Sequence, residues 1–116
     1  MKQPVLKGDK IVVGKKVTAP FPQDIARTIA ERISYDRLPA HTAESARLYI
    51  EHGCPPGSFL EAILRNQLVE SYSRADETNL AAMFDIVMWL YNDCPMAARG
   101  ENVDDWIEHG GLFGYE

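Results

Sequence analysis

Apolar side chains recur at helical spacing through most of the chain after residue 22. Three isoleucines, four residues apart, share one stripe of a helix predicted over residues 23–35: Ile25, Ile29 and Ile33. A second helix is predicted over residues 42–52. Thr42 can cap its first turn, and Gly53 can take the left-handed conformation that ends a helix.

Two longer apolar stretches follow. The third helix is expected to begin at Ser58, because Ser58-Phe59-Leu60-Glu61 has the capping-box pattern, and to fray near residues 73–75. The fourth is expected to begin at Asp76 or Thr78 and to end near Asn92. Its apolar residues cover nearly the whole circumference of a helical wheel, so it lies either in the centre of a core or against a partner.

A short fifth helix is predicted over residues 102–110, with Asn102 as its cap. The apolar tail that follows, residues 112–115, is expected to dock on the rest of the protein. The pattern therefore predicts a mainly α fold, a compact bundle of four to five helices with the third and fourth helices at its centre.

The first 20 residues have a different pattern. Short β-branched runs alternate with glycine-containing pairs typical of turns, the runs being Val5-Leu6, Ile11-Val12-Val13 and Val17-Thr18. This predicts a short N-terminal β-hairpin-like or extended arm. The expected organisation is a basic β-like arm over residues 1–20 and a single helical domain over residues 21–116.

Composition and charge narrow the function classes. A chain of 116 residues has room for one domain, and no apolar run is long enough for a membrane span. All five lysines lie in the first 16 residues, so the N-terminal arm is basic. The chain as a whole has a net charge of −5, so the body of the protein after the arm is acidic. Direct nucleic-acid binding is not expected of so acidic a body. The basic arm is either a solvated segment or one that contacts a second copy or a phosphate.

One five-residue pattern occurs twice, as an aromatic residue followed by Ile-Glu-His-Gly. It occupies residues 49–53 and again residues 106–110. Histidine suits the negative end of the helix dipole, and glycine suits the left-handed cap. Both copies are therefore interpreted as helix C-termini.

The sequence offers little for catalysis or metal binding. The three histidines and two cysteines lack the spacing of a zinc site, and the motifs of common nucleophilic or phosphate-binding enzymes do not occur. The expectation is a protein that is not an enzyme and has no cofactor or metal. A disulfide between Cys54 and Cys94 is one alternative, and free thiols are favoured for a cytoplasmic protein.

Two groups of residues are candidates for binding. Ser58 follows Gly57 at a helix start, where Arg65, Arg74 or Arg99 could supply positive charge for an anion. The polar residue Asn66 interrupts the apolar stretch of the third helix.

On the fourth helix, Asp85 is the only charged side chain between Leu80 and Tyr91, so it must be paired or exposed. Asp85 shares a face with Trp89, and Met83, Met88 and Trp89 together would form an exposed patch on a monomer. This patch favours a homo-oligomer, expected to be a two-fold dimer.

The chain resembles a family of small uncharacterised phage and prophage proteins over residues 38–111. The matching positions are His41-Thr42, Tyr49–Gly53, Pro56-Gly57, Phe59–Leu64, Asn66, Leu68, Ala75-Asp76, Asn79, Phe84–Val87, Leu90–Asn92, Pro95, Trp106 and Gly110-Gly111. The resemblance implies a phage-type accessory protein that acts in the cytoplasm of a bacterial host. Such proteins frequently act by stoichiometric binding.

The leading hypothesis is therefore an inhibitor of a bacterial host-defence protein, similar to an anti-CRISPR, that occludes a protein surface. The acidic pair Asp104 and Asp105 is a candidate for that contact. A first alternative is a sponge for a small cyclic nucleotide, bound at Ser58 with one of the three arginines. A second is a structural or assembly protein whose arm joins subunits.

Overall fold

In the computed structural model the described residues are 5–7, 10–13, 16–17 and 21–114, and the first three ranges are described by their backbone. The backbone ranges are the short strands β1 (Val5–Lys7), β2 (Lys10–Val13) and β3 (Lys16–Val17), paired antiparallel in the order β1-β2-β3. The remainder of the predicted arm lies outside the described residues.

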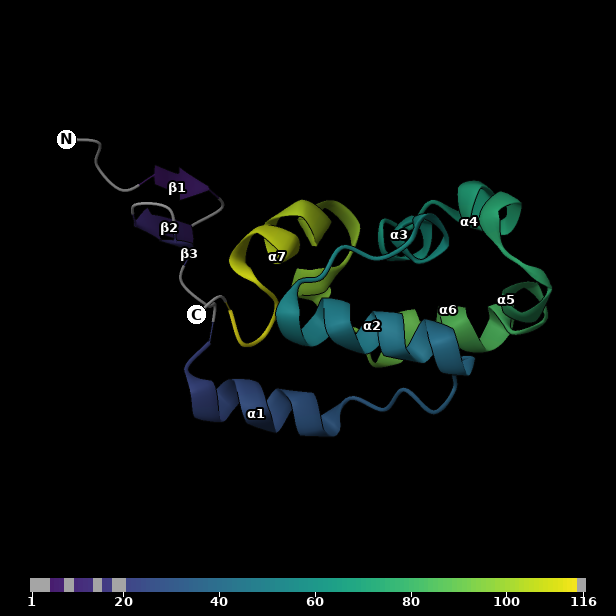
Figure 1. Ribbon diagram of the computed structural model, residues 1–116, viewed down its shortest axis with the longest axis horizontal. Coiled ribbons are helices and arrows are strands. Elements are labelled where there is room, and N and C mark those ends of the chain that lie inside the picture. Colours follow the sequence, from purple (N-terminus) through teal and green to yellow (C-terminus); the bar gives the residue numbers. More distant parts are fainter. Residues whose placement is uncertain (1–4, 8–9, 14–15, 18–20, 115–116) are drawn as a thin grey trace.

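The described chain is mainly helical, as predicted, but it contains seven α-helices rather than four or five. They are α1 (Gln23–Arg32), α2 (Ala40–His52), α3 (Ser58–Leu64), α4 (Leu68–Arg74), α5 (Glu77–Ala81), α6 (Met83–Asn92) and α7 (Val103–His109). Two 3₁₀ turns, η1 (Met96–Ala98) and η2 (Gly100–Asn102), precede α7. Figure 1 shows α1 along one side of α2, with α3 and α4 along the other.

The helix count differs because two predicted helices are each broken once. The third breaks at Asn66, whose φ of 65° is left-handed, and the amide of Gln67 donates to the carbonyl of Ala62 there. Asparagine tolerates this conformation better than most residues. The fourth breaks at Ala82, where φ is −100° and ψ is 10°, between α5 and α6.

The helix ends confirm two predicted caps and correct three. Gly53 and Gly110 both have left-handed backbone and end α2 and α7 as expected. The capping-box prediction was wrong: Gly57 is the N-cap of α3, and Ser58 is the first helical residue with no side-chain cap bond to it. Asn102 makes no side-chain cap bond, and Thr42 lies inside α2.

The core lies where α2, α3, α6 and α7 meet. Its largest fully buried side chains are Tyr49, Ile50, Leu64, Ile86, Trp89, Val103, Trp106 and Leu112. The prediction that the apolar tail docks is confirmed for Leu112, which is fully buried. The first helix contributes less than expected, since Ile25 is exposed and Ala26 is its buried residue.

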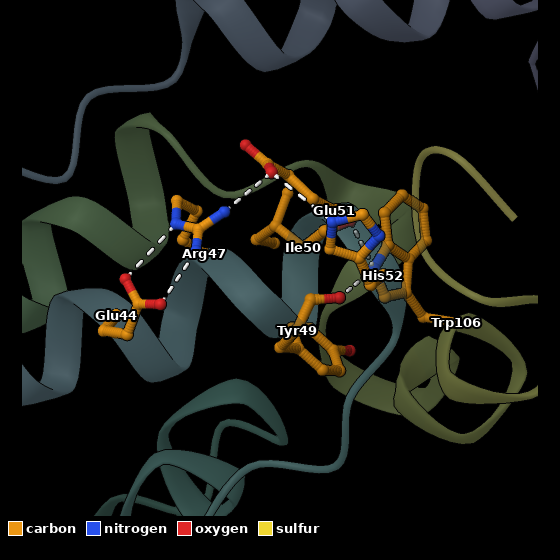
Figure 2. Close-up of polar contacts among 7 residues, drawn as sticks. All are labelled: Glu44, Arg47, Tyr49, Ile50, Glu51, His52 and Trp106. Carbon is orange, nitrogen blue, oxygen red and sulfur yellow. Dashed lines mark hydrogen bonds and ion pairs between the residues drawn. The ribbon is translucent and has the colours of Figure 1, made fainter.

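The two copies of the repeated pattern meet in space. The Trp106 indole N–H donates to the carbonyls of Tyr49 and Ile50, at 3.0 and 3.2 Å, which places α7 against the end of α2 (Figure 2). The amide of Leu112 donates to the same Ile50 carbonyl at 2.9 Å. The Tyr49 carbonyl also accepts the amide of Gly53, whereas the Ile50 carbonyl is one that the last turn of α2 would otherwise leave without a partner.

Candidate functional site

Helix α6 is apolar on two opposite faces, and only one of them faces the core. Phe84, Val87 and Tyr91 follow one another at spacings of three and four residues, so they share one stripe. Phe84 is 74% exposed and Tyr91 is 72% exposed. The stripe is therefore an apolar surface that nothing in the described chain covers.

Helix α4 extends this surface. Its residues Leu68, Val69 and Tyr72 are also exposed large hydrophobic side chains. Leu68 and Val87 line one small hollow together, and Val87 and Tyr91 line a larger one of about 410 Å³ whose wall includes Leu64 and Leu90. We call this surface the α4–α6 groove: Leu68, Val87, Leu90 and Tyr91 line its hollows, and Phe84 continues the exposed stripe of α6 beyond them.

Two of the residues singled out in the sequence lie at the rim of this groove. Asn66 and Arg99 line its larger hollow, and the guanidinium of Arg99 donates to the carbonyl of Leu90 at 3.1 Å. Asn66 reaches this position because the left-handed turn there separates α3 from α4. The groove thus has an apolar floor and a polar rim, the usual composition of a binding surface.

Arg65 was predicted to contact a ligand and Asp104 a protein partner. In the structure the two side chains form an ion pair with each other. The Arg65 guanidinium lies 2.9 Å from a carboxylate oxygen of Glu61 and 2.8 Å from one of Asp104, which ties α3 to α7. These two carboxylates raise the pKa of Arg65. Asp105 is half-buried on the same helix as Asp104.

The predicted methionine–tryptophan patch was wrong. Trp89 is fully buried and Met83 nearly so, while Met88 is half-buried. The Trp89 ring packs against that of Tyr35 at a centroid distance of 6.0 Å, so the segment between α1 and α2 covers this face. Trp89 therefore cannot contact a partner in this structure.

Asp85 is exposed, and its carboxylate lies 3.9 Å from the guanidinium of Arg37. This confirms that Asp85 is paired or exposed, while its role in binding stays a prediction. Of the three arginines considered for an anion at Ser58, Arg74 alone lies beside it, with its guanidinium 3.4 Å from the Ser58 carbonyl oxygen.

The cysteines are both free, which excludes the disulfide alternative: Cys54 is exposed and Cys94 is buried. Burial raises the pKa of the Cys94 thiol to about 12, so this thiol is protonated at neutral pH. Within residues 21–114, we find no group of His, Cys, Asp or Glu side chains that could hold a metal ion. Nor does any helix in the described ranges have the length and apolarity to cross a bilayer.

Sequence reasoning missed the exposed stripe of α6, although the signal was present in the spacing of Phe84, Val87 and Tyr91. A helix with apolar residues on every side has no preferred direction in its pattern, so spacing alone does not tell which side is exposed. Comparison with family models, with curated proteins and with solved structures finds no match to this chain.

Proposed function

We propose that this chain is a non-catalytic binding protein whose α4–α6 groove docks a protein partner. The observation that carries the proposal is the exposure of Phe84, Val87 and Tyr91 in one stripe above the hollows of the groove. Aromatic side chains that become buried at an interface commonly supply much of its binding energy. Leu68 and Leu90 provide the apolar floor on which such a contact forms.

The resemblance to phage proteins motivates a bacterial host-defence component as the partner, in the bacterial cytoplasm, with inhibition by occlusion of its surface. The candidate contact Asp104 lies next to the groove through its ion pair with Arg65. Arg65 and Asn66 line a further hollow of about 380 Å³ beside the groove, and Asp104 is bound to Arg65. A partner on the groove would therefore reach Asp104 as well.

The expected homodimer stays a proposal, and its contact moves to another face of the same helix. Since Trp89 is buried, a dimer through α6 would use Phe84 and Tyr91. Light scattering of the purified chain tests this, because substitution of these two residues would convert such a dimer to a monomer.

The nucleotide sponge has less support than protein binding. Arg65 is held by two carboxylates and Arg99 by the carbonyl of Leu90, so neither is arranged around Ser58. The assembly role depends on the side chains of residues 1–20, which lie outside the described part of the chain. We therefore retain one candidate function.

The test is a double substitution, Phe84→Asp with Tyr91→Asp, and a matched control, Met96→Asp. Met96 is 75% exposed, close to the exposure of the two aromatic residues, but it lies on η1 and does not line the groove. Each protein is produced in bacterial strains that carry one defence system each, including CRISPR–Cas. Phage plating is then measured against strains without defence.

We expect the unaltered chain to restore plating on at least one defended strain. The double variant should lose more than about tenfold of that effect, because two central aromatic contacts are removed, while Met96→Asp should retain it. The proposal is wrong if no defended strain responds to the unaltered chain. It is equally wrong if the double variant protects phage as well as the unaltered chain does.

A further inference from the structure

Another hollow lies away from the α4–α6 groove, where α2 and α3 meet the junction of α4 and α5. Its volume is about 270 Å³. Polar side chains reach it from four segments of the chain: His41, Ser45, Ser58, Arg74, Asp76 and Asn79. Phe59 and Leu60 supply an apolar wall. We call this hollow the α2–α5 cleft.

Asn79 is the most informative residue of this cleft, because it is a polar side chain that is only 4% exposed. Its carboxamide oxygen accepts a hydrogen bond of 2.7 Å from the Thr42 hydroxyl, and its backbone amide donates to Asp76. No hydrogen bond from the Asn79 Nδ2 group is found within the described residues. Asn79 Nδ2 is not among the buried polar atoms of the described residues that lack a partner, so it is open to solvent on the cleft wall and available to a ligand.

The charges of the cleft are balanced. The Arg74 guanidinium pairs with Glu70 at 3.1 Å and contacts the Ser58 carbonyl, and it has five N–H donors in all. Among the described residues that line the cleft, Asp76 is the one carboxylate, and its second oxygen lies 3.7 Å from the His41 imidazole. A doubly charged phosphate would meet repulsion from Asp76 and Glu70. A ligand with one negative and one positive group would meet less repulsion, because it carries one negative charge and its positive group can face Asp76.

We infer that the α2–α5 cleft binds a small zwitterion, an L-α-amino acid with an apolar side chain. The carboxylate of the ligand is bound by Arg74 and the Asn79 Nδ2 donor, and its ammonium group by Asp76. Its side chain packs on Phe59 and Leu60. The volume is slightly below that of pockets for drug-sized molecules, which suits a ligand of about ten non-hydrogen atoms.

The first experiment titrates the ¹⁵N-labelled full chain with L-leucine, L-methionine and L-phenylalanine, and follows amide shifts by NMR. At least one of the three should give saturable shifts at Ser45, Ser58 and Asn79. For L-leucine, 4-methylpentanoate lacks the ammonium group and 3-methylbutylamine lacks the carboxylate; corresponding analogues are used for the other two. Either omission should weaken binding about tenfold or more, since each removes a charged contact.

Two substitutions with a matched control complete the test. Arg74→Gln and Asp76→Asn each remove one charge, and asparagine at position 76 can still cap α5. Each should weaken amino-acid binding about tenfold or more, whereas Arg27→Gln, an exposed arginine of α1, should leave it unchanged. Amide spectra of all three variants establish that they fold.

The inference is overturned if none of the three amino acids gives saturable shifts below about 10 mM, or if both charge variants bind like the unaltered chain. It is also overturned if inorganic phosphate or AMP shifts the same amides more strongly than the amino acids do, because the cleft would then be an anion site. The Phe84→Asp, Tyr91→Asp protein should still bind the amino acid. The cleft and the groove therefore succeed or fail separately.

Discussion

The backbone contact between the ends of α2 and α7 gives the sharpest stability prediction. Gly53 and Gly111 have φ angles of 71° and 74°, and their backbones lie against each other. A Cβ atom on Gly53 would lie 2.8 Å from the Cα of Gly110, and one on Gly111 would lie 2.6 Å from the backbone nitrogen of Gly53. Because these neighbours are backbone atoms, no side-chain rotation can relieve the overlap.

Two other glycines serve as controls, because they distinguish the cost of a left-handed backbone conformation from the cost of steric overlap. Gly57 has a φ of −68° and open space around it, so alanine fits there. Alanine is a poorer N-cap than glycine but restricts the unfolded chain, and because these effects offset each other, Gly57→Ala should change the free energy of unfolding by less than about 0.5 kcal/mol. Gly100 has a φ of 65°, and a Cβ atom on it would meet no other atom within 4 Å, so alanine there costs about 1 kcal/mol from conformation alone.

Alanine at Gly53 or Gly111 has the same conformational cost, and its Cβ atom also pushes apart the two backbones that meet there. The displaced backbone carries the bonds from Leu112 to the Ile50 carbonyl and from Phe113 to the Glu51 carbonyl, at 2.9 and 3.0 Å. Each such bond contributes about 1 kcal/mol. The expected loss is therefore about 3 kcal/mol or more for either substitution.

Urea unfolding of the four alanine variants, followed by far-ultraviolet circular dichroism and tryptophan fluorescence, measures these differences. Gly57→Ala should be the most stable variant and Gly100→Ala the next. Gly53→Ala and Gly111→Ala should be the least stable. If Gly53→Ala and Gly111→Ala lose no more stability than Gly100→Ala, the backbone contact does not stabilise the fold and the reasoning fails.

Two further predictions concern thiols and pH. A thiol reagent at neutral pH should modify Cys54 in the folded protein and Cys94 only after unfolding, because Cys94 is buried and protonated. Mass spectrometry of labelled peptides measures this, and equal rates of modification of the two thiols in the folded protein would contradict it. Burial raises the pKa values of Cys94, Tyr35 and Tyr49, so the fold favours their neutral forms. Stability should therefore fall as the pH rises from about 9, the ordinary pKa of the thiol, to about 12, its pKa in the folded protein. Urea midpoints across that range measure the decline, and a constant midpoint would contradict it.

The sequence predicted helix ends best where one residue determines the local backbone. Glycine at positions 53 and 110 has a conformational freedom that its neighbours lack, so the ends of α2 and α7 could be located. The break at Asn66 has a weaker local signal, since asparagine tolerates left-handed backbone without requiring it, and the break at Ala82 has none. They depend on packing between helices, and so does the position of Thr42, which is predicted to cap a helix and instead binds Asn79 from inside α2.

The candidate groove was only half predictable for a similar reason. The apolar circumference of the fourth predicted helix left open whether that helix lies in the core or against a partner, and it did not show that α6 has one side buried and the other exposed. Tyr35 decides this, because it covers Trp89 from a segment far away in the sequence. Asn66 and Arg99 were singled out as polar positions, yet only the folded chain brings them to one rim.

The two apolar sides of α6 contribute differently to stability. Measuring the stability of variants therefore distinguishes a docking surface from one that supports the fold. Ile86 and Trp89 are fully buried and hold the core together. Phe84 and Tyr91 remain exposed, so the fold gains little from their apolar character. The double variant with Asp at both positions should therefore unfold at nearly the same urea concentration as the unaltered chain. Loss of phage protection without loss of stability would then be a loss of binding, whereas a large drop in stability would mean that the stripe supports the fold.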